Sequence, residues 1–148
     1  MNEINSFKKG LKDGLPICLG YFSVAFAFGI FAIENGLTVF QAVIISLTNL
    51  TSAGQLAGVP IMANGSLIEL AVSQLVINSR YSLMSVSLSQ KFSKSVKLKD
   101  KFLIAYGNTD EIFAVAVSQK GDVGKKYMWG LILLPVIGWT SGTLFGAI

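Results

Sequence analysis

The part of the chain that decides the fold is the polar run Asn49-Leu50-Thr51-Ser52-Ala53-Gly54-Gln55, which lies at the centre of an uncharged stretch from Asn35 to Ile68. Small polar side chains there cannot simply face lipid, because an unpaired polar group in hydrocarbon costs several kcal/mol. We interpret the run as the wall of a translocation site. The alternative is that small residues pack closely against neighbouring helices.

Composition places the whole chain in a membrane. Hydrophobic residues make up 52% and charged residues 14% of the sequence, and the mean hydropathy is +0.61. The stretches Gly14–Ile33 and Tyr127–Ile148 carry no charge, and each is close to the roughly 20 residues that a membrane-spanning helix needs. These values indicate an integral membrane protein with transmembrane helices.

Several chemistries are disfavoured by the residues that the sequence lacks. It has one cysteine, Cys18, and no histidine, which removes disulfides, the commonest metal ligand and the commonest general base. Asp110 and Glu111 are adjacent on a predicted helix and would point about 100° apart, so they rarely converge on one reacting atom. We expect no enzyme activity, no catalytic residue, no metal and no cofactor.

Clusters of lysine constrain the topology. Lys8, Lys9 and Lys12 precede the first apolar segment and five lysines occupy the loop Lys91–Lys101, a pattern typical of cytoplasmic ends. If both lie inside, the chain crosses the membrane an even number of times between them. Three apolar segments occupy that interval: Leu15–Ile33, Leu37–Ala63 and Leu67–Gln90. The middle one is predicted to be broken or re-entrant, because of its polar centre and its weak helix formers Gly54, Gly58 and Pro60.

A second interrupted segment is predicted downstream. The largely apolar segment at residues 102–119 is interrupted by Gly107-Asn108-Thr109-Asp110-Glu111. Aligning Gln55-Leu56-Ala57 with Glu111-Ile112-Phe113 brings the two interruptions into rough register, as in transporters built from inverted repeats. The fold class we predict is all-α: one polytopic membrane domain over residues 1–148, with about five hydrophobic segments, two of them broken or re-entrant, and a possible inverted repeat.

Arg80 requires a partner because it lies in an apolar segment. We expect it to face the interior of the helix bundle. Glu69 on the same helix is about 16 Å away, too far for a direct pair, so Asp110 or Glu111 is the expected partner. Arg80 would then hold a substrate carboxylate while the acid meets an ammonium group or a coupling proton. The alternative is a structural ion pair.

Two further patterns bear on surroundings. A polar stripe on one predicted helix lies roughly opposite Glu69 and consists of Gln74, Asn78, Tyr81 and Ser85. A helix that is polar on two sides is expected to be surrounded by protein. Trp129 and Tyr127 fit a position at the membrane interface. The loop Lys91–Lys101 is expected to meet anionic lipid headgroups rather than nucleic acid, because it holds one aromatic residue.

Four stretches together resemble the AzlC family of branched-chain amino acid permeases. They are Gly14-Leu15-Pro16 with Leu19-Gly20-Tyr21 and Ala27-Phe28-Gly29, then Ser52-Ala53-Gly54-Gln55-Leu56, then Asn78-Ser79-Arg80-Tyr81, and finally Thr109-Asp110-Glu111-Ile112-Phe113-Ala114. The resemblance implies a multi-pass cell-membrane exporter with a small partner subunit of the AzlD type. It also implies a longer protein, so this chain is expected to be truncated at its C-terminus.

The predicted substrates are leucine, isoleucine, valine and possibly methionine. Specificity should be broad, because one methylene in an apolar pocket is worth roughly 1–3 kcal/mol. An ion gradient would drive export, since the sequence has no Gly-rich nucleotide-binding loop. A non-transporting membrane subunit is the alternative, and a passive channel is disfavoured by the lack of an obvious filter motif. The candidate substrate-binding residues are Asn49, Thr51, Ser52, Gly54, Gln55, Asn78, Arg80, Tyr81, Asn108, Thr109, Asp110 and Glu111.

Overall fold

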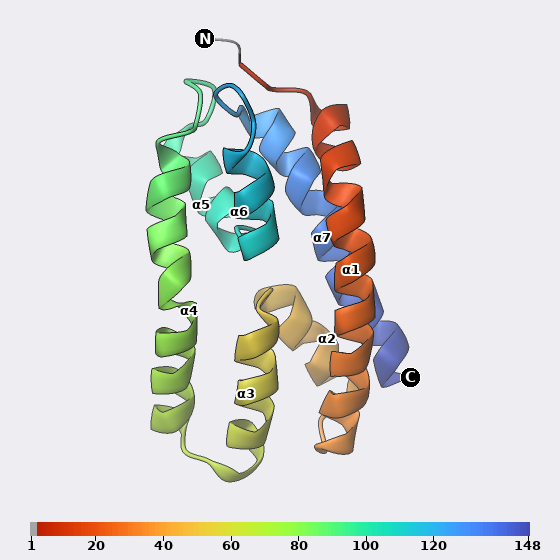
Figure 1. Cartoon of the computed structure of the whole chain (residues 1–148). Helices are drawn as coiled ribbons and strands as arrows, with labels where there is room; N and C mark the ends of the chain where they lie inside the picture. The colour runs from red at the N-terminus through yellow and green to blue at the C-terminus, as the bar shows by residue number, and fades with distance from the viewer. Residues whose placement is uncertain (1–2) are drawn as a thin grey trace. The chain divides into compact units, whose positions relative to one another are not determined.

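The computed structural model describes residues 3–148, and in this range the chain is helical without a named strand (Figure 1). The elements are α1 (Phe7–Glu34), α2 (Val39–Thr48), α3 (Ser52–Asn64), α4 (Leu67–Ser89), α5 (Leu98–Tyr106), α6 (Asp110–Val117) and α7 (Lys125–Ala147). The all-α prediction is therefore confirmed. Within the described residues α1 and α7 are long and apolar enough to span a membrane.

The predicted break in the middle segment is present. Thr38 and Gln41 form a reciprocal capping box that starts α2, and the helix ends before Asn49. The break was predicted partly because Gly54, Gly58 and Pro60 are weak helix formers. That reason was wrong, because α3 runs through all three residues. The chain instead leaves the helix at residues 49–51, where extended backbone precedes the first turn of α3.

The second break is also present, between α5 and α6 at residues 107–109. Asp110 and Glu111 were predicted to belong to the interruption, but they form the first turn of α6, where carboxylates interact favourably with the helix dipole. Thr51 and Thr109 are the N-caps of α3 and α6. This correspondence shifts the predicted register of the repeat by two residues and pairs Gln55 with Phe113.

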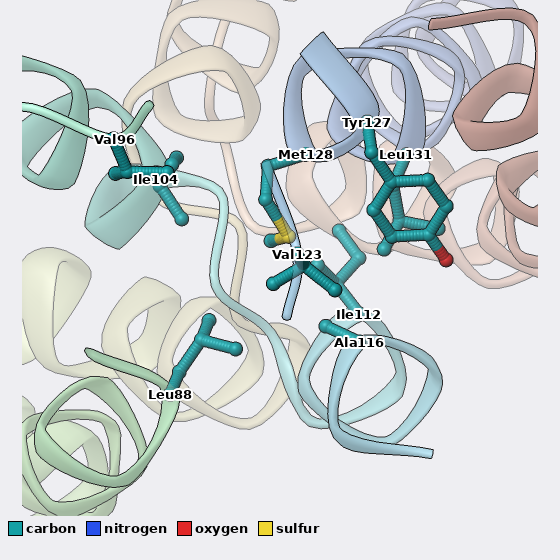
Figure 2. Packing of buried hydrophobic residues seen from close by; sticks show 9 residues of the cluster. All are labelled: Leu88, Val96, Ile104, Ile112, Ala116, Val123, Tyr127, Met128 and Leu131. Atoms are coloured by element: carbon teal, nitrogen blue, oxygen red, sulfur yellow. The ribbon is translucent and has the colours of Figure 1, made fainter. Parts of the chain in front are cut away.

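The helices form two compact units, and α1, α4 and α7 each contribute to both. Unit 1 comprises Arg80–Val136 and the N-terminal residues up to Cys18, whereas unit 2 comprises Leu19–Ser79 and Ile137–Ile148. Figure 2 shows the core of unit 1, where Tyr127, Met128 and Leu131 of α7 meet Ile112 and Ala116 of α6. A smaller core in unit 2 contains Phe28, Ala32, Ala42, Val59 and Ala147.

At one end of unit 1 three segments join through backbone hydrogen bonds. The Ile4 amide donates to the Asp122 carbonyl at 2.8 Å, and the Ser93 amide donates to the Val123 carbonyl at 3.0 Å. The N-terminal segment, the start of the lysine-rich loop and the segment before α7 therefore lie together. This confirms that the first two basic regions share one end of the unit, while their cytoplasmic location stays a prediction.

Glycines set the approach of α1 to α7 within each unit. In unit 1, a Cβ built on Gly130 would collide with the carbonyl oxygen of Phe7. In unit 2, a Cβ built on Gly146 would collide with the carbonyl oxygen of Phe26. Backbones this close need small residues at the contact, as is common between helices in membranes.

Two predictions, about the surroundings of α4 and of Tyr127, were wrong for this chain. Leu88 is the one buried residue of α4, and Leu67 and Leu83 are 85% and 76% exposed, so the rest of the described chain does not surround that helix. Tyr127 is not interfacial, because its ring is fully buried and its hydroxyl donates to Asp13 Oδ2 at 2.9 Å.

Candidate transport site

In unit 2 the start of α3, at the break, has no side-chain cap. Thr51 is buried, with extended backbone, and its side chain accepts no hydrogen bond from the first turn. Thr51 Oγ1 has no hydrogen-bond partner among residues 3–148. The backbone N–H groups of a first helical turn have no partner within the helix, so this end keeps its capacity to bind an anion.

Gln55 links the break to two other helices. Its Nε2 donates to the Asn49 carbonyl at 2.9 Å and to Ser46 Oγ at 3.1 Å. Ser46 in turn shares a 2.6 Å hydrogen bond with Thr143 of α7. All three polar side chains are buried, and such a chain of bonds fixes α2, α3 and α7 at the break. Gln55 Oε1 finds no partner among residues 3–148.

Gln74 of α4 joins three more of the predicted residues. Its Nε2 donates to the Gly54 carbonyl at 2.8 Å, and its Oε1 accepts from Asn78 at 3.2 Å and from Asn49 at 3.5 Å. Asn49, Gly54 and Asn78 are thereby brought together in unit 2. Ser52 is the first residue of α3 and is half-buried. It is close to Asn49 and Gly54 in sequence.

In unit 1, Arg80 and Asp110 form a direct ion pair with a 3.0 Å separation between Nη1 and Oδ2. The predicted partner of Arg80 is therefore confirmed as Asp110. Arg80 also donates to the hydroxyl of Tyr81 at 3.2 Å, with its guanidinium 5.0 Å from the ring centroid. The expectation that Arg80 faces the interior was wrong within this chain, because its side chain is 49% exposed.

The remaining predicted residues of unit 1 lie around the second break. Asn108 and Thr109 are buried, and Asn108 Nδ2 donates to Ser85 Oγ at 3.2 Å. Thr109 is the N-cap of α6 without a side-chain capping bond, and Glu111 is exposed in the first turn. The two breaks thus share a buried threonine at the N-cap but differ in charge.

That difference decides what each helix end can bind. The first turn of α3 carries no acid, so a carboxylate can approach its N–H groups without repulsion. The first turn of α6 carries Asp110 and Glu111, so it favours a cation. No group of three or more metal-ligating side chains occurs among residues 3–148.

Sequence reasoning missed Ser46 and Thr143 as parts of the site. Each is a hydroxyl residue inside an otherwise apolar helix, and such residues commonly bond across helices in membranes. That signal could have marked them as buried, but not as partners, because 97 residues separate them.

The described residues combine a helical fold, two helices long and apolar enough to span a membrane, and two helix breaks. A family model described as AzlC protein matches residues 16–148. The chain belongs to the AzlC family, which confirms the resemblance found from the sequence. No solved structure matches the chain.

Three relatives extend this assignment. The chain is 32% identical to an uncharacterized membrane protein of Archaeoglobus fulgidus, over 96% of this chain and 62% of the relative. It is 31% identical to the inner membrane protein YgaZ of Escherichia coli, over 96% and 60%. It is 28% identical to an uncharacterized membrane protein of Helicobacter pylori, over 98% and 66%. The chain therefore spans about three fifths to two thirds of the length of these curated relatives.

Proposed function

We propose that the chain belongs to a transporter that exports leucine, isoleucine, valine and methionine, uses an ion gradient and works with a small AzlD-type membrane partner. It is not an enzyme in this proposal. Membership of a family of membrane proteins supports a transport-related role. The paired helix breaks support it further, because transporters with broken helices bind substrates at the ends of half-helices.

The observation that carries the proposal is the uncapped start of α3. An amino acid carries a carboxylate, and the N–H groups of the first turn together with the Thr51 hydroxyl could donate to it. Arg80 is a weaker candidate for the same role, because it is already paired with Asp110. We therefore assign the substrate carboxylate to the α3 end and interpret the Arg80–Asp110 pair as a structural ion pair.

The substitution Thr51→Val tests this assignment. Valine keeps the shape of threonine, and the lost hydroxyl has no partner among residues 3–148, so folding should be unaffected or slightly improved. A hydrogen bond to a charged group contributes about 1.5–3 kcal/mol, so we expect export to fall roughly tenfold or more. The measurement is efflux of the four amino acids from dipeptide-loaded cells that also express the small partner.

Thr140→Val is the matched control. Thr140 Oγ1 is also buried without a partner among residues 3–148, but it lies inside α7 and not at the start of a helix. Export by this variant should equal that of the unmodified chain. If Thr51→Val exported as much as the unmodified chain, the assignment of the substrate carboxylate to the α3 end would be contradicted. No export by the unmodified chain with any partner would favour the non-transporting subunit instead.

A further inference from the structure

A groove of about 320 Å³ lies between the C-terminal part of α4 and α5 in unit 1, and the proposed transport role does not use it. Its walls are mostly apolar, and Val86, Leu98 and Phe102 are 63%, 71% and 72% exposed beside it. The groove is therefore open to the surroundings of the chain, which for a membrane protein include lipid.

The two ends of the groove differ in chemistry. Lys101 lines one end, with its ammonium group 6.0 Å from the centroid of the Phe92 ring. Asn108 and Ser85, hydrogen-bonded to each other, line the other end. Lys101 lies in α5 and Asn108 in the break that follows α5, so more than one helical turn separates the two ends.

Lysines are frequent in the sequence before Lys101. Lys91, Lys94 and Lys97 precede α5, and Lys99 lies in its first turn. Three carboxylates lie nearby: Asp100 accepts from the Lys97 amide at 2.9 Å, Glu3 accepts from Ser93 at 2.8 Å, and Asp122 precedes the Val123 that pairs with the segment before α5. The five lysines outnumber them, so this end of the groove favours an anion.

We propose that this groove binds an anionic phospholipid, with the phosphate at Lys101 and an acyl chain along the apolar walls. Burial of methylene groups between α4 and α5 would stabilise the complex. An amino acid fits less well, because its carboxylate and ammonium groups are attached to one carbon and cannot reach both polar ends. The acyl chain would leave the groove at the Asn108–Ser85 pair.

The test uses the purified full chain in detergent and native mass spectrometry with phosphatidylglycerol and phosphatidylcholine of identical acyl chains. We expect tighter binding of phosphatidylglycerol. Lys101→Gln should reduce that preference about fivefold, since a lysine near an anionic lipid surface contributes about that factor. Lys8→Gln removes the same charge from an exposed position in α1 and should leave the preference unchanged.

A second pair of variants tests the acyl chain. Ala105 is exposed and lines the groove, so Ala105→Trp should fill it and weaken binding of both lipids several-fold without removing a polar contact. Leu103 is exposed on α5 and lines a different depression, so Leu103→Trp is the control.

Four outcomes would overturn the proposal. If Lys101→Gln and Lys8→Gln reduced the preference for phosphatidylglycerol equally, the preference would be a general effect of charge and not a property of the groove. Equal binding by both tryptophan variants would exclude an acyl chain in the groove. Competition by glycerol phosphate as strong as by the whole lipid would reduce the site to a phosphate site. Displacement of the lipid by leucine would show that the groove is an amino acid site.

Discussion

At the scale of residues, the ion pair between Arg80 and Asp110 is the contact that the sequence defined most closely. An arginine in an apolar segment needs an acid, and two acids were available in the next interrupted segment. The structure selects Asp110, with Nη1 and Oδ2 3.0 Å apart, whereas Glu111 is the more exposed of the two acids. Both side chains of the pair are about half exposed, so screening limits its contribution.

A double-mutant cycle measures that contribution. We expect Arg80→Gln and Asp110→Asn to be coupled by about 0.5–1 kcal/mol in thermal unfolding of the detergent-purified chain, as for other partly exposed pairs. The control cycle of Arg80→Gln with Glu111→Gln should show a smaller coupling, because the ion pair joins Arg80 to Asp110. A larger coupling for Glu111 would contradict the pairing.

The buried network around Gln55 shows what sequence reasoning could not supply at this scale. Gln55 was predicted as a site residue because a polar amide in an apolar segment needs partners. Its partners are Ser46 and the Asn49 carbonyl, and Ser46 in turn bonds Thr143. A contact between α2 and α7 depends on tertiary packing, which no local pattern in residues 40–55 encodes.

At the scale of elements, both helix breaks could be predicted but their ends could not. Polar groups at membrane depth need protein cover or a helix end, so the polar runs at residues 49–55 and 107–111 indicated breaks. This signal is not sufficient by itself, because α4 carries Gln74, Asn78 and Arg80 without a break. Gly54, Gly58 and Pro60 suggested the wrong position, because their low helix propensity is overridden in α3. The polar N-cap residues Thr51 and Thr109 mark where α3 and α6 actually begin.

The glycine contacts between α1 and α7 give a prediction at the same scale. Gly146→Leu should destabilise the chain by about 1–3 kcal/mol or more, because a side chain there meets the Phe26 backbone, which cannot move aside as a flexible side chain can. Gly20→Ala is the control, since nothing lies within 4 Å of a Cβ at that position. It should be neutral or stabilise α1 by about 0.5–1 kcal/mol. The measurement is thermal unfolding in detergent.

If Gly146→Leu were as stable as the unmodified chain, the close approach of α1 to α7 would be contradicted. Gly130→Leu repeats the test in unit 1, where the Phe7 carbonyl is the obstacle. Similar losses in both units would show that each contact contributes to stability separately.

At the scale of the whole molecule, the sequence predicted that the chain is a membrane protein, but it did not predict what surrounds each helix. Hydropathy predicted a membrane protein, and the family of membrane proteins to which the chain belongs agrees with it. The polar stripe of α4 suggested a helix enclosed by protein, yet Leu88 is its one buried residue. Polar residues on two sides of a helix do not reveal whether its neighbour is protein, a groove or lipid, because each of these neighbours depends on elements distant in sequence.

The lysine clusters lead to the last prediction, which concerns sidedness. Hydrogen bonds join the segments at Ile4, Ser93 and Val123, so the neighbouring positions Lys8, Lys94 and Lys120 should lie on one side of the membrane. The positive-inside rule places that side in the cytoplasm. Glu34 ends the 28-residue helix α1, which is about 42 Å long and exceeds the ~30 Å hydrocarbon core. Glu34 should therefore face the opposite side.

Single cysteines in a Cys18→Ser background test this arrangement. In intact cells a membrane-impermeant maleimide should label Glu34→Cys and spare Lys8→Cys, Lys94→Cys and Lys120→Cys, all four positions being exposed. After permeabilisation all four should react, which controls for accessibility of the thiol. Labelling of Lys94→Cys but not Lys8→Cys from outside would contradict the structure, because both belong to the hydrogen-bonded end of unit 1. Labelling of all three lysine positions from outside would leave the structure intact and reverse the predicted orientation.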